Sequence, residues 1–194
     1  MSPLTVFDEL VLHPLLGDLP MGWLQRLAVH GRRVVRPAGY RLCSQNGPAD
    51  NFWLLRSGAV ALDTYLPGRG DVVIELVGVD GVVGCTWLVP PYRCTVGAVV
   101  ADKIRAVEFR AAGVRDLIGA DPALGLELTT RFVAVLTRRL GASTRQLVEL
   151  SADRESRCLL PRPGQRGQDL RPCPEHSRSA VLDMKDRHQE AGDE

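Results

Sequence analysis

The spacing of hydrophobic and polar positions changes along the chain, and helical spacing comes first. After Asp18, the apolar residues Leu24, Leu27 and Ala28 recur at intervals of three and four among polar neighbours. This interval places side chains on one face of an α-helix. Residues 1–31 therefore predict short helices that form an N-terminal segment of a domain.

From residue 32 the hydrophobic runs shorten to between four and eight residues, and Gly, Pro, Asn and Asp separate them. About eight such runs follow one another up to residue 110, which is the spacing of an all-β sandwich or barrel. The segment at residues 67–71, PGRGD, has the glycines that a tight hairpin turn requires. Residues 32–110 therefore predict a β-roll built largely from hairpins.

Helical spacing returns after the β-roll. Residues 111–120 predict a short helix, and Asp121 followed by Pro122 is typical of a helix N-terminus. The helix expected up to residue 150 carries one long apolar stripe, which includes Leu124, Leu128, Phe132, Leu136 and Leu140. This stripe is longer than one roll can cover, which favours a dimerisation helix. Packing of the helix onto its own domain is the alternative.

Residues 151–194 differ from everything before them. Large apolar residues are few, and both signs of charge are mixed with Pro, Gly and Gln. Such a composition cannot bury enough apolar surface to form a core. We therefore expect a disordered polar tail.

Charge and cysteine usage limit the classes of function. A formal net charge of +1 gives no field that favours nucleic acid or a membrane surface. No signal peptide and no membrane-spanning run of apolar residues is recognisable. The cysteines are odd in number and form no CxxC pair: Cys43, Cys85, Cys94, Cys158 and Cys173. We expect reduced thiols and a cytoplasmic location.

Recognisable catalytic and metal-binding patterns are absent from the sequence. All four histidines lie outside the predicted strands, so a metal site of the cupin type lacks its ligands. Asp63, Asp71 and Glu75 have no His or Cys partner at a spacing known for acid–base catalysis. We therefore expect no enzyme activity and no bound metal.

The order of elements and the glycine and arginine positions together resemble the cyclic nucleotide-binding domains of the catabolite-activator and Fnr-type (Crp/Fnr-like) regulators. The resemblance covers about residues 10–150. Matching residues of the first turn and the following strand are Gly39, Leu42, Gln45, Asn46, Gly47, Ala49, Asp50, Phe52, Leu54, Gly58 and Val60. Matching residues of the phosphate-binding segment are Gly81, Gly84, Arg93, Cys94 and Thr95.

This resemblance implies a jelly roll (double-stranded β-helix) with N-terminal helices and a long C-terminal helix. It also implies a phosphate cassette in which a short helix and an arginine hold a cyclic nucleotide such as cAMP or cGMP. The ligand-binding residues carried over are Gly84, Cys85, Thr86, Trp87, Leu88, Arg93, Cys94 and Thr95. Cys85 stands where the family has a glutamate that accepts from the ribose, and a thiol is a poor acceptor. Trp87 and Tyr92 either stack on a ligand or fill the roll.

Three functional hypotheses follow from these observations. The first is a non-catalytic sensory module that binds a small anion in the roll and signals through its C-terminal helix, with a hinge near residues 111–120. The second is a degenerate domain that binds no nucleotide and acts as an interaction or scaffold protein. The third is a thiol-based redox sensor that uses Cys85 and Cys94, while two small buried thiols are the plainer interpretation. We expect a homodimer or a protein partner, and no direct DNA binding, because the tail after Leu150 is too polar to form a DNA-binding domain.

Overall fold

A computed structural model describes residues 4–159, and most of the predicted tail lies outside the described residues. The chain begins with two short helices, α1 (Val6–Val11) and α2 (Met21–Ala28). The Thr5 hydroxyl accepts a hydrogen bond from the Asp8 backbone N–H, and the Asp8 carboxylate accepts one from the Thr5 N–H, which forms a capping box at the start of α1. The N-terminal helical segment predicted from the sequence is therefore present.

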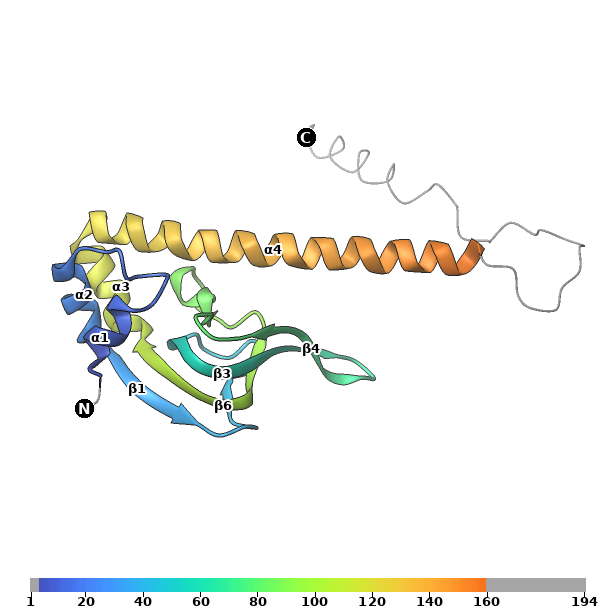
Figure 1. Ribbon diagram of the computed structural model, residues 1–194, viewed down its shortest axis with the longest axis horizontal. Coiled ribbons are helices and arrows are strands. Elements are labelled where there is room, and N and C mark those ends of the chain that lie inside the picture. Colours follow the sequence, from blue (N-terminus) through green and yellow to red (C-terminus); the bar gives the residue numbers. More distant parts are fainter. Residues whose placement is uncertain (1–3, 160–194) are drawn as a thin grey trace, which may run out of the picture. The chain divides into compact units, whose positions relative to one another are not determined.

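Six strands follow and pair in antiparallel fashion. They are β1 (Gly31–Arg36), β2 (Arg41–Cys43), β3 (Asn51–Leu66), β4 (Gly70–Val77), β5 (Val82–Val83) and β6 (Gly97–Arg110). The main sheet has the order β1-β6-β3-β4, with β2 also paired to β6 and β5 to β3 (Figure 1). Between β5 and β6 lies the single-turn 3₁₀ helix η1 (Cys85–Leu88).

The sequence predicts about eight strands, whereas the structure contains six in this region, because two pairs of predicted strands each form one long strand. The predicted break in β3 is at Gly58, which has a φ of 80° and lies among shifts of register between β3 and β6. A Cβ atom at this position would lie 2.3 Å from the Lys103 carbonyl oxygen. Glycine therefore permits a local bulge against β6 without ending the strand.

Two helices follow the roll, α3 (Ala111–Ala120) and α4 (Pro122–Leu159). The Asp121 carboxylate accepts a hydrogen bond from the Leu124 N–H at 3.1 Å, which confirms the predicted start of α4. The helix continues beyond its predicted end at residue 150. The segment 151–159 is polar but rich in good helix formers, and a helix needs no core of its own to extend by a few turns.

Hydrophobic side chains form two clusters in the compact unit that extends to Arg145. One fills the roll between β3, β4, β5 and β6 around Leu55, Val60 and Ile104. The other joins the roll to the helices through Phe52, Trp87 and Phe109. α1, α2 and α3 gather at one end of the sheet (Figure 1). Among residues 4–159, no helix combines the length and apolar character needed to span a membrane.

Candidate functional site

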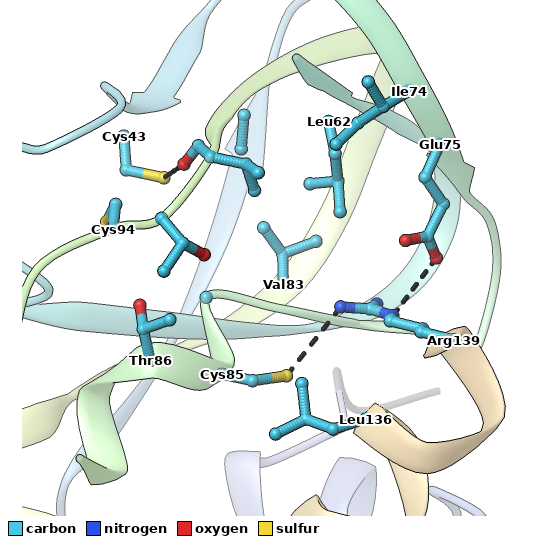
Figure 2. A pocket seen from close by; sticks show the side chains of 14 residues that line it. Cys43, Leu62, Ile74, Glu75, Val83, Cys85, Thr86, Cys94, Leu136 and Arg139 are labelled. Atoms are coloured by element: carbon cyan, nitrogen blue, oxygen red, sulfur yellow. Dashed lines mark hydrogen bonds and ion pairs between the residues drawn. The ribbon is translucent and has the colours of Figure 1, made fainter. Parts of the chain in front are cut away.

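A cavity of about 170 Å³ lies in the roll beside η1 and α4. Figure 2 shows side chains from η1, β4 and α4 pointing into it. The lining residues that carry polar side chains are Cys43, Glu75, Cys85, Thr86, Cys94, Thr95 and Arg139. The remaining walls are largely aliphatic, from residues such as Leu62, Val83 and Leu136.

Gly84 makes the entry into η1 possible. Its φ of 85° is in the left-handed region, where a residue with a Cβ atom is strained. A Cβ atom there would also lie 3.0 Å from the Asn51 carbonyl oxygen on β3. The turn at Gly84 directs Cys85 and Thr86 into the cavity wall, where the sequence placed a ligand-binding segment.

Trp87 points to the opposite side of η1 and does not line this cavity. It is fully buried and stacks on Phe52 with ring centroids 4.6 Å apart, and its ring meets Phe132 of α4 edge-on at 5.4 Å. Leu88 packs against the same cluster. Of the two roles considered for Trp87, the structure shows the packing role.

Arg139 on α4 is the one arginine or lysine among the residues that line the cavity. Its Nε forms an ion pair with Glu75 Oε1 of β4 at 3.1 Å, and its Nη1 lies 3.8 Å from Cys85 Sγ (Figure 2). The guanidinium also donates to the Val82 carbonyl. Arg139 thus links the long helix to two segments of the cavity wall.

The sequence analysis missed both Arg139 and Glu75. Residue 139 follows another arginine on a helix face, and Glu75 occupies a polar strand position, so each looks like surface. Nothing local in the sequence indicates that these two residues, on β4 and α4, meet in the fold. The exposed fractions of their side chains, 35% for Glu75 and 20% for Arg139, show that the pair is partly shielded from water.

Arg93 lies outside the cavity and is exposed. Its Nη1 donates to the Asn46 carbonyl oxygen at 2.7 Å, and residues 93 and 48 form an isolated β-bridge. Its two successors, Cys94 and Thr95, do line the cavity. The structure therefore brings Gly84, Cys85, Thr86, Cys94 and Thr95 to one cavity and leaves Trp87, Leu88 and Arg93 outside its lining.

Three cysteines meet this cavity, and their environments differ. Burial raises the pKa of the Cys85 thiol, although the charge of Arg139 acts in the opposite direction. A hydrogen bond from Cys43 lowers the pKa of Cys94 to about 7, despite the opposing effect of burial. The same hydrogen bond, followed by burial, raises the pKa of Cys43. All three are free thiols.

The apolar stripe predicted for dimerisation divides between two faces of α4. Leu124, Leu128 and Phe132 are buried in the domain's own core. Leu136 lines the cavity and is 43% exposed, while Leu140 is 69% exposed. The first three residues of the predicted dimer set therefore lie on the face that packs against the domain, as the alternative interpretation expected.

Candidate metal ligands do not cluster in the part of the chain that the structure describes. Between residues 4 and 159, no group of three or more His, Cys, Asp or Glu side chains is arranged to hold a metal ion. His13 is buried, but at the end of α1 and away from the cavity.

No family model matches this chain, and no curated protein matches it. Solved structures do match. A Geobacter metallireducens protein described as cyclic nucleotide-binding is 25% identical with a TM-score of 0.62, over 72% of this chain and 98% of that one. A cyclic nucleotide-binding domain from Methylobacillus flagellatus is 20% identical with a TM-score of 0.64, over 74% and 83%.

A Thermus thermophilus catabolite activator protein is 22% identical with a TM-score of 0.56, over 71% of this chain and 63% of that one. These matches agree with the observed antiparallel roll, its flanking helices and its long C-terminal helix. The resemblance drawn from the sequence and the predicted jelly roll are therefore confirmed. The chain has the fold of the cyclic nucleotide-binding domains of Crp/Fnr-type regulators.

Proposed function

We propose that this chain is a non-catalytic sensory module that binds a small anion of the cyclic nucleotide type in the cavity and signals through α4. The observation that carries the proposal is the position of Arg139. This side chain belongs to α4 but reaches the wall formed by η1, β4 and β5. A ligand that pairs with Arg139 would therefore change what holds the helix against the roll.

The chemistry of the lining supports an anion with hydroxyl groups. Arg139 offers a forked set of donors that suits a phosphate, and Thr86 and Thr95 can donate or accept. The similar structures are described as cyclic nucleotide-binding, so the common cyclic nucleotides cAMP and cGMP are the first ligands to test. Glu75 holds Arg139 now, so an anionic ligand would have to replace the Glu75 carboxylate.

The cavity is smaller than pockets for drug-sized ligands, which begin at roughly 300 Å³. A nucleotide would require Arg139 to leave Glu75 and Cys85 and the wall to widen. The proposal therefore couples ligand entry to a movement of the Arg139 side chain. The short helix α3, which precedes α4, is the hinge that we propose for the movement of the longer helix.

The resemblance assigns the phosphate to Arg93, whereas the cavity contains Arg139. Calorimetric titration with cAMP and cGMP shows which arginine binds the phosphate, if Arg139→Gln and Arg93→Gln are compared with the unmodified protein. The control is Arg138→Gln, which changes an exposed neighbour of Arg139 on the same helix. We expect micromolar binding that Arg139→Gln weakens by about 10- to 150-fold, because a charged hydrogen bond contributes about 1.5–3 kcal/mol. The control should bind as the unmodified protein does.

A loss confined to Arg93→Gln would return the phosphate site to the position that the resemblance implies. No heat with either nucleotide would favour the second candidate, a scaffold that binds no nucleotide. One observation supports that candidate: Glu75, Cys85 and the Val82 carbonyl already occupy the Arg139 guanidinium. A domain of this kind would show no nucleotide-dependent rise in its thermal unfolding temperature.

We also propose that α4 pairs with α4 of a second copy. The exposed apolar residues Leu126, Val133 and Leu140 are spaced by seven, which places them along one side of the helix. Leu147 continues the same interval in the sequence and is also exposed. This face replaces the buried residues Leu124, Leu128 and Phe132 in the predicted dimer contact.

The free thiols of Cys43, Cys85 and Cys94 support a reducing compartment, so the proposal includes a cytoplasmic location.

A further inference from the structure

The charged and the apolar parts of the cavity wall are separated. Among the described residues that line the cavity, the charged side chains are Arg139 and Glu75, which form an ion pair at 3.1 Å (Figure 2). These side chains are 20% and 35% exposed, so solvent reaches this side of the cavity. Leu62, Val83 and Ala98 are at most 5% exposed and form a buried wall. The cavity therefore offers one positive and one negative charge next to solvent, and an apolar surface deeper in the roll.

The buried wall can satisfy few hydrogen bonds. Cys43, Cys85 and Cys94 are free thiols, and a free cysteine packs as a small apolar group. The remaining polar side chains are the hydroxyls of Thr86 and Thr95. Because a buried polar group without a hydrogen-bond partner is costly, the part of a ligand that enters the roll should be apolar.

The volume of the cavity, about 170 Å³, limits the size of that apolar part. An engineered apolar cavity of about 150 Å³ holds one molecule of benzene. A group of about three to six carbon atoms is therefore the size that this cavity accepts without widening. A cyclic nucleotide is much larger, which is why its entry requires the wall to move.

The ion pair beside the apolar wall selects the charged part of the ligand. A lone carboxylate could bind Arg139, but it would be repelled by the like charge of Glu75. A lone ammonium group would be repelled by Arg139 in the same way. A ligand with both charges avoids either repulsion, because its carboxylate can bind Arg139 while its ammonium group binds Glu75. A partly exposed ion pair contributes little to stability, so separating the two residues to admit such a ligand costs little.

We propose that the cavity binds a free α-amino acid with an aliphatic side chain of about the size of that of leucine. The α-carboxylate binds Arg139 of α4, the α-ammonium group binds Glu75 of β4, and the side chain lies against Leu62 and Val83. The inference rests on the proposed function in one respect, that this cavity is the ligand site, but it names a different class of ligand. The bound amino acid would link α4 to β4 in place of the direct ion pair.

Calorimetric titration of the unmodified full chain tests each part of the ligand separately. L-Leucine should give saturable binding. Isocaproate, which lacks the ammonium group, and isoamylamine, which lacks the carboxylate, should each bind at least about tenfold more weakly, because each leaves one charged side chain without its ligand partner. In the series alanine, α-aminobutyrate, norvaline and norleucine, the affinity should rise about fourfold with each added methylene group.

Two substitutions identify the charged partners. Arg139→Gln and Glu75→Gln should each weaken leucine binding by about 10- to 150-fold, since each removes a hydrogen bond between charged groups. The matched controls Arg138→Gln and Asp80→Asn change exposed charged residues outside the cavity lining and should leave the affinity within about twofold. Glu75→Gln separates the two classes of ligand, because it should weaken the binding of leucine and strengthen that of a cyclic nucleotide.

Isocaproate that binds as tightly as leucine would overturn the inference, because the ammonium group would then have no partner. The absence of heat with leucine, on a chain that circular dichroism shows to be folded, would overturn it as well, and this result requires no substitution. Binding of cAMP without binding of leucine would refute the inference and leave the proposed function standing. Binding of leucine without binding of cAMP would uphold the inference and remove the nucleotide from the proposed function, whereas the failure of both ligands would reject both proposals.

Discussion

At the scale of single residues, Cys85 determines the character of the cavity. The resemblance places a carboxylate at this position, whereas a protonated thiol carries no charge and accepts hydrogen bonds poorly. The carboxylate that lies in the cavity instead is Glu75 of β4, and it is already paired with Arg139. The Arg139 guanidinium is thus already paired with a carboxylate of the protein itself, and an anionic ligand has to compete with Glu75 for it.

Trp87→Ala should lower the free energy of unfolding by about 3–5 kcal/mol, because it removes a fully buried ring stacked on Phe52. Urea unfolding followed by circular dichroism measures this change. Tyr92→Ala is a matched control from the same loop. Tyr92 is 38% exposed and contacts Arg115 through its ring face, which contributes about 1 kcal/mol at most. Unchanged stability with lost ligand binding would instead show that Trp87 belongs to the ligand site.

His13 gives the fold a dependence on pH. Burial lowers its pKa to about 4, its Nδ1 accepts a hydrogen bond from the Leu15 N–H, and its Nε2 has no partner. Because the folded-state pKa lies below the unfolded value of 6.5, the unfolded chain binds the proton first as pH falls. The free energy of unfolding should therefore have its full value above about pH 6.5 and should fall by up to about 3 kcal/mol as the pH is lowered to about pH 4.

The variant His13→Asn keeps a hydrogen-bond acceptor and removes the titrating group. Its stability should be lower at neutral pH but should change less between about pH 6.5 and about pH 4 than that of the unmodified chain. If the free energy of unfolding, measured with urea, fell equally with pH in the two proteins across this range, His13 would not be the source of the pH dependence.

At the scale of elements, α4 has two faces of different character. Its inner face enters the core through Leu128 and Phe132, and Arg131 binds the Leu15 carbonyl and the Asp18 carboxylate of the N-terminal segment. These contacts place the helix on the domain before any partner is present. The outer face carries Val133 and Leu140 to solvent, and apolar side chains at this interval are typical of a helix that pairs with another.

The double substitution Val133→Glu with Leu140→Glu should convert a dimer to a monomer, because it places like charges along the proposed seam. Sedimentation velocity measures the change, and the thermal unfolding midpoint of the isolated monomer should alter little. Ala142→Glu adds charge to an exposed position on the opposite side of the helix and should leave the dimer intact. A chain that is monomeric before any substitution would contradict the proposed pairing.

At the scale of the whole domain, α4 is tied to the roll at two neighbouring places. Phe132 packs in the aromatic cluster of Phe52 and Trp87. Two turns further along α4, Arg139 forms its ion pair with Glu75 at the cavity. The first contact is apolar and has no partner that a ligand could replace. The second is electrostatic and partly exposed, so it is the one that an anion can alter.

Glu75→Gln should strengthen nucleotide binding by up to about tenfold, because the Arg139 guanidinium no longer has to leave a carboxylate. Calorimetry measures the affinity, and hydrogen exchange of the backbone amides of α4 reports the loosened helix. Asp80→Asn is the control, since it breaks an ion pair with Arg56 that lies outside the cavity. Equal or weaker binding by the Glu75 variant would mean that this ion pair is not the barrier to the ligand.

The periodicity of the sequence was sufficient for the order of helices and strands, and the Asp121-Pro122 pair for the start of α4. These features depend on neighbours within a few residues, so the local pattern determines them. The place of Cys85, Thr86, Cys94 and Thr95 in one cavity also agrees with the segment that the resemblance indicated.

Only the tertiary structure decided which side chains meet across the roll. Arg139 and Glu75 are separated by more than forty residues, and no local pattern distinguishes them from surface residues. Cys43 and Cys94, also far apart in sequence, come to line one cavity. The tertiary structure likewise turned Trp87 into the core and left Arg93 on the surface. A hydrophobic stripe shows that a helix packs against something, but the contact partner on each face depends on how the whole chain folds.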